Sequence, residues 1–295
     1  MTRIEVTLAD ALTSMPVRAF LKANQGISNT IWKRIKNSGT FAINGEICNA
    51  ARSEVKTGDI ITYDILRPSD IAAEDLPLDI RYEDEWLLVI NKPAGQLVHP
   101  TTQESHGTVG NALMHYFAAK SEAHAFHPVH RLDRDTSGLL LVAKEPQIQY
   151  LLSPKGCKNF KREYQAIIEG KLTPADGIVD APIARSLPSI ILRKVSPEGQ
   201  DARTHYRTVK TNGKLSLIEL ELETGRTHQI RVHMAHLGHP LLGDDLYGGN
   251  MDLIQRQALH AFRLSFRHPM TQKELVITTP PPADFLQITA SLDRQ

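Results

Sequence analysis

Three polar segments with side chains suited to chemistry interrupt an otherwise apolar chain. They cover residues 91–100, 130–138 and 224–233. Each lies beside a run of apolar residues, and polar loops that contain glycine at strand ends are where binding and catalytic sites are usually built. Turn chemistry, a helix cap or a surface ion pair would explain any one segment taken alone.

The middle segment is the hardest to explain as a simple turn. It places Arg131, Asp133, Arg134 and Asp135 directly before the apolar run 138–143. A carboxylate at the start of a buried strand must be paired, because an isolated buried charge is very costly. An arginine partner would hold such a carboxylate ionised. An ionised, oriented carboxylate without an adjacent histidine or metal is a candidate nucleophile.

Two other kinds of site fit the sequence less well. His233 and His236 would share one face of a predicted helix and could bind zinc. No carboxylate or cysteine completes that ligand set, and no His-Glu-x-x-His pattern occurs. Ser137 and His130 lack the nucleophile elbow of a serine hydrolase. The sequence therefore predicts no metal site and no hydrolase pair.

The elements that must position these segments are mostly strands. Residues 79–82 and 86–90 flank a short turn, and residues 205–209 and 215–222 flank Asn212-Gly213, a strong hairpin signal. Further strands are predicted over 138–143, 164–168, 258–266 and 274–278. Helices are predicted over 108–120 with Thr108 as cap, over 227–237 ending at Gly238, and near Phe285. This pattern predicts an α+β fold with a mixed, largely antiparallel central sheet and flanking helices.

Residues 1–70 have a different texture and predict a small separate α/β module. Two short helices over 17–36, the second capped by Ser28 or Asn29, precede a hairpin at Asn44-Gly45 and a strand over 59–66. No acidic residue lies between Asp10 and Glu46, whereas five basic residues do: Arg18, Lys22, Lys33, Arg34 and Lys36. A solvated helical surface and an anion-binding face both explain this pattern. Residues 71–77 are expected to be a linker, and 78–295 a catalytic domain.

Composition says more about the cellular compartment of the protein than about any reaction that it catalyses. The 295 residues carry 34 basic and 33 acidic side chains, so the net charge of +1 favours no partner by itself. Cys48 and Cys157 match no disulfide framework or metal spacing, and we expect reduced thiols. The start of the chain lacks the apolar run of a signal peptide, and no stretch is long enough to span a bilayer. We expect a cytoplasmic protein without a membrane partner; a monomer is favoured, although no sequence feature sets the oligomeric state.

With all three polar segments in view, the chain resembles the ribosomal large-subunit pseudouridine synthase A family. The resemblance rests on Asn-Lys-Pro-Ala-Gly at 91–95, on His-Arg-Leu-Asp at 130–133 followed by Thr-Ser-Gly-Leu-Leu at 136–140, and on Gly-Arg-Thr-His-Gln-Ile-Arg-Val-His at 225–233. The third motif continues as Gly-His-Pro-Leu-Leu-Gly-Asp at 238–244 and Leu-Tyr-Gly at 246–248. The similarity covers residues 77–285 and implies the pseudouridine synthase fold.

The resemblance also implies roles for individual residues. Asp133 matches the catalytic aspartate and Arg231 the arginine that pairs with it, whereas Asp135 lies where the family requires no acid. Tyr164 matches the tyrosine that packs against the target base, and Arg131 an arginine that helps to displace the target nucleotide. The isomerisation gains or loses no atom or electron, so no small-molecule cofactor is expected; the lack of a phosphate-cradling glycine loop agrees.

The N-terminal part resembles a second family, the S-four-like RNA-binding module. The resemblance rests on residues 31–36, 41–45 and 57–61, while the first helix departs from the module's usual Arg-Leu-Asp type of start. Together the two resemblances predict an isomerase that acts on structured RNA, either large-subunit ribosomal RNA or transfer RNA. Two alternatives remain, a non-catalytic RNA-binding or ribosome assembly factor and a metal-dependent RNA hydrolase.

Overall fold

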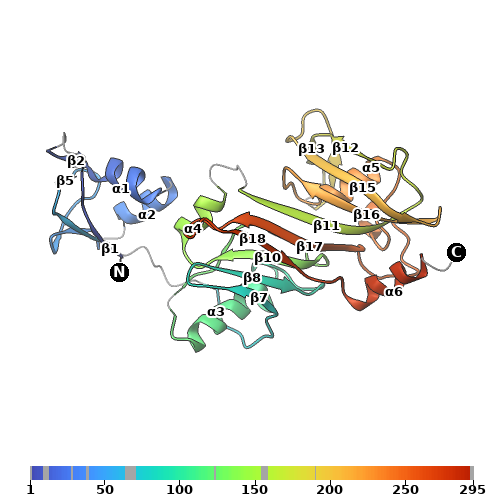
Figure 1. The fold of residues 1–295 in the computed structure, drawn as a ribbon, viewed down its shortest axis with the longest axis horizontal. Helices are drawn as coiled ribbons and strands as arrows, with labels where there is room; N and C mark the ends of the chain where they lie inside the picture. Colours follow the sequence, from blue (N-terminus) through green and yellow to red (C-terminus); the bar gives the residue numbers. More distant parts are fainter. Residues whose placement is uncertain are drawn as a thin grey trace.

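The computed structural model describes residues 2–8, 13–27, 29–37, 40–63, 71–122, 124–153, 159–189 and 191–292. A small unit forms one end of the chain, and a larger α+β body holds the three polar segments (Figure 1). Within these ranges no helix combines the length and apolar content needed to cross a membrane. Cys48 is a free, half-buried thiol, and Cys157 lies outside the described residues.

The small unit has its own hydrophobic core, which gathers apolar side chains from Val6 to Tyr63. Two helices cover a four-stranded sheet with the order β1-β6-β3-β4, and β2 pairs with β5. The elements are β1 (Thr2–Glu5), β2 (Met15–Pro16), α1 (Val17–Gln25), α2 (Asn29–Asn37), β3 (Ala42–Ile43), β4 (Glu46–Ile47), β5 (Glu54–Val55) and β6 (Ile60–Tyr63). Both predicted helices and the Asn44-Gly45 hairpin are therefore present, and the helix cap predicted at Ser28 lies outside the described residues.

The larger body is built on a ten-stranded sheet with the main order β12-β15-β16-β11-β17-β10-β8-β7. All pairings in it are antiparallel except that of β10 with β17, so the predicted mixed, largely antiparallel sheet is confirmed. Its strands are β7 (Ile80–Glu83), β8 (Leu87–Lys92), β9 (His127–Pro128), β10 (Ser137–Ala143), β11 (Phe160–Glu169), β12 (Asp176–Asp180), β15 (Arg203–Thr211), β16 (Leu215–Leu222), β17 (Leu259–Arg267) and β18 (Glu274–Thr278). A separate hairpin pairs β13 (Ile183–Arg185) with β14 (Arg193–Val195).

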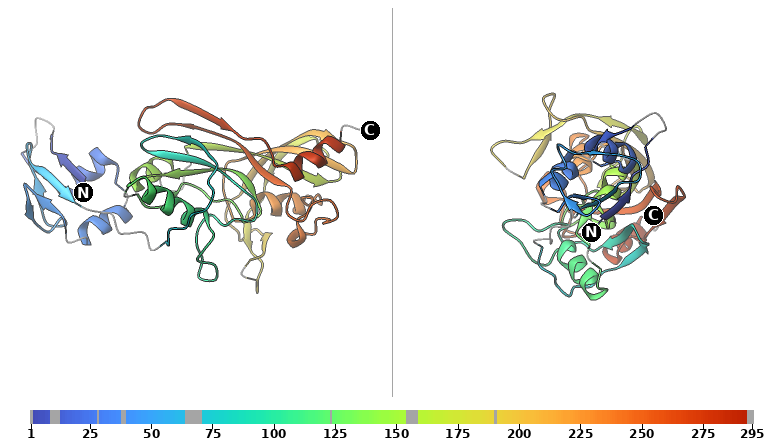
Figure 2. Two further views of the ribbon diagram at one scale, coloured as in Figure 1. Left: turned by 90° about the horizontal axis from the view of Figure 1, so that it is seen from below. Right: turned by 90° about the vertical axis from the view of Figure 1, so that its left-hand side faces the viewer.

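The helices of the larger body within the described ranges are α3 (Val109–Ala119), α4 (Pro146–Leu152), α5 (Gln229–His236), the short 3-10 helix η2 (Asp245–Tyr247) and α6 (Ala283–Ser291). In the two further views of Figure 2, α3 can be followed in green and α6 in red. Thr108 caps α3 as predicted, in a reciprocal capping box with Asn111. α5 begins two residues later than predicted, because His228 adopts a left-handed backbone conformation with φ 58°.

The strand β10 explains why the sequence there is continuously apolar. Leu140 and Val142 contribute to the core on one face of the sheet, and Leu139 and Leu141 to the core on the other. All seven residues of β10 are buried. A strand covered on both faces cannot show the alternation of a half-exposed strand. The loop that carries Asp133 therefore leads directly into the interior of the sheet.

The segment that was predicted as a linker packs on the larger body. Ile71 contacts the main core, the Asn111 side chain donates to the carbonyl of Ala72, and the Gly107 amide donates to the Glu74 carboxylate. These contacts hold the segment beside the start of α3, although its residues are exposed or half-buried. The division into a linker over 71–77 and a catalytic domain from residue 78 stays a prediction.

Candidate active site

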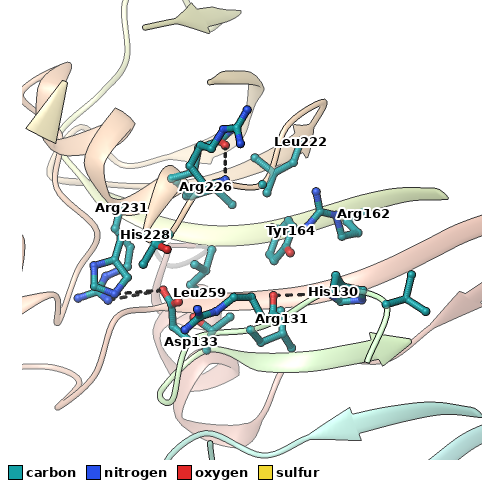
Figure 3. A pocket seen from close by; sticks show the side chains of 17 residues that line it. His130, Arg131, Asp133, Arg162, Tyr164, Leu222, Arg226, His228, Arg231 and Leu259 are labelled. Carbon is teal, nitrogen blue, oxygen red and sulfur yellow. Dashed lines mark hydrogen bonds and ion pairs between the residues drawn. The ribbon is translucent and has the colours of Figure 1, made fainter. Parts of the chain in front are cut away.

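A pocket of about 210 Å³ lies where the second and third polar segments meet the strand β11. It is lined by parts of the loop before β10, by Arg162 and Tyr164 of β11, and by residues 225–231 (Figure 3). The structure thus brings together Arg131, Asp133, Tyr164 and Arg231, all of which were predicted as site residues.

Asp133 occupies a tight turn at the entrance to β10. Its carbonyl accepts the amide of Thr136, and the neighbouring Leu132 is buried in the main core. The Asp133 side chain is 17% exposed, so the carboxylate reaches the pocket while its backbone is fixed. From the first polar segment, the buried Lys92 ammonium donates to the carbonyls of Arg134, Pro93 and Gln96. This ammonium ties the Asp133 loop to the neighbouring turn.

Arg231 faces Asp133 from α5, with 3.6 Å between its Nη1 and Asp133 Oδ2. Its tighter partner is Asp244, whose two carboxylate oxygens accept from Nε and Nη2 at 2.7 Å each. Burial lowers the pKa of Arg231, but the hydrogen bonds and charge of Asp244 outweigh burial and the pKa is raised. Asp244 therefore fixes the guanidinium with two bonds and leaves Nη1 directed towards Asp133.

Asp244 is a functional residue that the sequence reasoning did not single out. It is fully buried and follows the apolar pair Leu241-Leu242 in the continuation of the third motif. A carboxylate that ends an apolar run needs a cationic partner, and that signal was available. What the sequence did not show is that this partner is Arg231, because the two residues meet only through the turn after α5.

His228 joins Asp133 to a second group of side chains. Its Nε2 lies 3.9 Å from Asp133 Oδ2, and its Nδ1 lies 2.9 Å from the hydroxyl of Tyr247. The same hydroxyl accepts the backbone amide of Arg193 on β14. Burial lowers the pKa of His228, while the charge of Asp133 acts in the opposite direction. The Tyr247 hydroxyl therefore holds the His228 ring through Nδ1, which leaves Nε2 on the side of Asp133.

Tyr164 forms the wall of the pocket on β11. It is 4% exposed and follows a β-bulge between Glu163 and Tyr164, which redirects the side chain. Burial raises the pKa of Tyr164, and the nearby Arg162 guanidinium lowers it to a smaller extent. The phenol is thus held in its neutral form and presents an aromatic surface at the pocket.

The pocket rim and the small unit carry the predicted RNA-binding cations. Arg131 is exposed and lines the pocket, as does Arg226. In the small unit four of the five predicted side chains are exposed on α1 and α2, namely Arg18, Lys22, Lys33 and Lys36. The side chain of Arg34 lies outside the described residues. Arg18 donates to Asn29, which links the two helices.

The histidine and serine alternatives are explained by other contacts. Both ring nitrogens of His233 are engaged, Nδ1 with Thr204 Oγ1 and Nε2 with the carbonyl of Ala181. Ser137 Oγ contacts the buried ring of His260, and the ring of His130 accepts the amide of Leu141. In the part of the chain that the structure describes, no three His, Cys, Asp or Glu side chains gather as a potential metal site.

Comparisons with known proteins show the family to which the chain belongs. The family described as RNA pseudouridylate synthase matches residues 86–236. The RNA pseudouridine synthase YjbO of Bacillus subtilis is 43% identical over 89% of this chain and 94% of its own length. The ribosomal large subunit pseudouridine synthase D of Vibrio cholerae is 41% identical over 86% of this chain and 83% of its own.

Solved structures show the same fold. The human protein named RNA pseudouridylate synthase domain containing 4 superimposes with a TM-score of 0.58 and 25% identity, covering 72% of this chain and 92% of that one. The human protein named RNA pseudouridylate synthase domain containing 1 gives a TM-score of 0.57 over 78% of this chain and 98% of its own, at 24% identity. The predicted fold is therefore confirmed.

Proposed function

This chain belongs to the RNA pseudouridylate synthase family and isomerises uridine in RNA to pseudouridine, and from that premise we propose that Asp133 is its catalytic carboxylate. The observation that supports the proposal is the convergence of the Asp133 carboxylate and the Arg231 guanidinium, 3.6 Å apart, at a pocket where the second and third polar segments meet β11. The family favours this function over the two alternatives, a non-catalytic RNA-binding factor and a metal-dependent RNA hydrolase.

In this proposal the residues around the pocket divide the work. Arg231, fixed by Asp244, faces the Asp133 carboxylate and orients it. Tyr164 packs against the target base, and the exposed Arg131 takes the place that the base leaves in the RNA stack. Removing a base from its stack costs a few kcal/mol, which an aromatic wall and an inserted side chain can offset.

The reaction changes the ring atom through which the base is bonded to the ribose, and it needs no outside reactant. The bond between ribose C1′ and uracil N1 breaks, the base turns, and C1′ rejoins the ring at C5. The C5 hydrogen is lost as a proton and N1 regains one, so atoms and electrons balance. Asp133 can serve by attacking C1′, by removing a sugar proton as the base departs, or by attacking the ring. All three routes require an ionised carboxylate at the sugar end of the pocket.

Replacing Asp133 by asparagine tests the assignment, because asparagine keeps the size and removes the charge. We expect no pseudouridine from Asp133→Asn in a single-turnover assay, while its affinity for RNA stays within about threefold. Asp135→Asn is the matched control and should retain activity, because Asp135 does not line the pocket and its carboxylate acts instead on the charge of the buried Lys92. Unchanged product formation by Asp133→Asn would refute the assignment.

For the substrate we propose structured large-subunit ribosomal RNA. The support is the name of the Vibrio cholerae relative, a ribosomal large subunit pseudouridine synthase, together with the sequence resemblance to the synthase A family. Residues 1–70 act in this proposal as an S-four-like RNA-binding module that adds affinity through the exposed cations of α1 and α2. We further propose that the chain acts as a monomer in the cytoplasm.

The module can be tested without removing it. A variant with Arg18, Lys22, Lys33 and Lys36 changed to glutamine should bind RNA more weakly and with a smaller salt dependence. Each lost phosphate contact lowers the slope of log affinity against log salt by about 0.7 to 0.9. The rate on bound RNA should change little, as it should after deletion of residues 1–70. An unaltered affinity and salt slope would refute the RNA-binding role of the module.

A further inference from the structure

Arg162 is a buried side chain at the pocket whose charge the reaction described so far does not use. Its side chain is buried, with 4% exposed, and it lies on β11 two residues before Tyr164. Among the described residues no carboxylate pairs with it. Its neighbours are neutral. Nη2 donates to the carbonyl of Thr224 at 2.8 Å, the guanidinium interacts with the phenol of Tyr164, and the guanidinium carbon lies 5.3 Å from the centre of the Phe160 ring.

The other cations of the pocket have evident explanations. Arg231 is balanced by Asp244 and Asp133. Arg131 and Arg226 are exposed, so water solvates them. Arg162 is buried without a counter-charge, and its Nε has no hydrogen-bond partner in the described part of the chain. A buried cation in this state is costly unless a ligand supplies negative charge and acceptors.

The position of Arg162 tells which part of the substrate meets it. Asp133 and Arg231 lie at one end of the pocket, and Arg162 lies beside Tyr164 at the other (Figure 3). A uridine with its ribose at Asp133 therefore extends its base towards Tyr164 and Arg162. The uracil ring carries two carbonyl oxygens, which are acceptors for guanidinium donors.

We infer that Arg162 is a further catalytic residue, which donates hydrogen bonds to a uracil carbonyl and stabilises the negative charge that the base acquires. This inference rests on the proposed site at Asp133. When the C1′–N1 bond breaks, its electron pair stays with the base and spreads on to the carbonyl oxygens. When a carboxylate attacks the ring instead, the electrons also move to a carbonyl oxygen. Negative charge therefore develops on the base in each of the three routes proposed for Asp133, and Arg162 can stabilise it in all of them.

A pre-placed donor at a developing charge has a known scale of effect. Loss of one such donor reduces the rate of the chemical step by about 10² to 10³-fold. The effect on RNA affinity should be small, because Arg162 contacts one base and the uncharged uracil gains little from it before reaction. The signature is therefore a loss of single-turnover rate with an RNA dissociation constant within about threefold of the wild type.

Arg162→Met separates this role from a structural one. Replacing a buried charge by an apolar side chain of similar length often leaves stability unchanged or raises it. We expect Arg162→Met to fold with an unchanged or higher Tm and to lose at least about 100-fold in single-turnover rate. Arg162→Lys keeps the charge but not the planar set of guanidinium donors, so its single-turnover rate should fall less than that of Arg162→Met. Arg226→Gln is the matched control, an exposed pocket arginine whose loss should affect affinity more than rate.

The outcomes distinguish this inference from the proposal on which it rests. If Arg162→Met reacts within threefold of the wild type while Asp133→Asn is inactive, the role of Arg162 is refuted and the site stands. If both variants remain active, the proposed site itself is refuted. If Arg162→Met loses rate only in proportion to a lower Tm and recovers it at low temperature, Arg162 is structural and the inference fails. Should Arg162→Met not fold, Arg162→Gln replaces it under the same criteria.

Discussion

Replacing Asp244 by asparagine should damage both the stability and the chemistry of the enzyme. Asp244 is completely buried and accepts two hydrogen bonds of 2.7 Å from Arg231. Asparagine has the same size but carries no charge and presents one acceptor oxygen instead of two. After the substitution Arg231 keeps one bond and lies beside only one carboxylate, that of Asp133 at 3.6 Å.

The magnitude follows from the burial of this pair. Removing one partner of a buried ion pair costs about 3 to 5 kcal/mol, because the remaining charge loses its compensation. The retained acceptor and the nearby Asp133 place Asp244→Asn at the lower end, about 3 kcal/mol. For a domain of this size each kcal/mol lowers Tm by about 2 to 4 °C, so we expect a decrease of about 6 to 12 °C. Arg231 is also free to shift by about 1 Å towards Asp133, a misplacement that typically costs about 100-fold in rate.

Two measurements check this reasoning, thermal unfolding followed by circular dichroism and single-turnover pseudouridine formation well below the lowered Tm. Asp245→Asn is the control, since Asp245 is the exposed neighbour with the same change of charge. A Tm within about 2 °C of the wild type would show that Asp244 does not compensate a buried charge. A normal rate in a destabilised Asp244→Asn enzyme would show that the orientation of Arg231 does not matter for Asp133.

Three further changes test other parts of the structure. Gly138→Ala should destabilise the protein strongly or prevent folding, because Gly138 has φ +111° and an added Cβ would lie 2.3 Å from a backbone oxygen of β17. Gly213 has open space around it, so the control Gly213→Ala should lower the free energy of unfolding, measured by calorimetry, by only about 1 kcal/mol. Tyr247→Phe should leave RNA affinity unchanged and slow the single-turnover rate by about tenfold. It should also alter the NMR shifts of the His228 ring nitrogens, because the hydroxyl that contacts Nδ1 and fixes the tautomer is gone. Unchanged nitrogen shifts would contradict this role of Tyr247. Glu83→Gln should lower the free energy of unfolding by about 2 kcal/mol at pH 7. Burial raises the pKa of Glu83, but its bonds to Tyr116, Lys144 and Lys120 lower that pKa to about 2. The stability that the ionised Glu83 contributes is therefore present above pH 4.5 and disappears as the pH falls from 4.5 towards 2. Denaturant titrations of Glu83→Gln and wild type should therefore converge near pH 2, and a constant difference would refute the ionic origin.

The sequence predicted the elements whose pattern is local. The hairpin at Asn212-Gly213 and the capped helix α3 were both readable, because a turn or a cap depends on neighbouring residues. The buried strand β10 was readable from its continuous apolar run. The pair β13–β14 and the short strands β1, β2 and β5 were not predicted, because two to four residues carry too little pattern and their partners lie far along the chain.

The sequence predicted several residues of the site, but it did not predict which side chains contact one another there. Asp133, Arg231 and Tyr164 came from motifs, and the structure places all three at one pocket. Arg162 was missed because the strand was expected to begin at Tyr164, whereas β11 begins at Phe160. An arginine at an inward position of a strand breaks the alternation by which a half-buried strand is detected. Asp244 was missed because its partner depends on the turn between α5 and η2.

The parallel pairing of β10 with β17 joins two segments that are made far apart in time during synthesis. The strand behind Asp133 needs a neighbour that ends at Arg267, and Arg231 and Asp244 also come long after Asp133 in the chain. A nascent chain that has already emerged through residue 153 therefore holds Asp133 without its arginine and without one wall of its sheet. Chemistry at the pocket must wait until the chain has been made through β17, so a shorter nascent chain can meet RNA without modifying it.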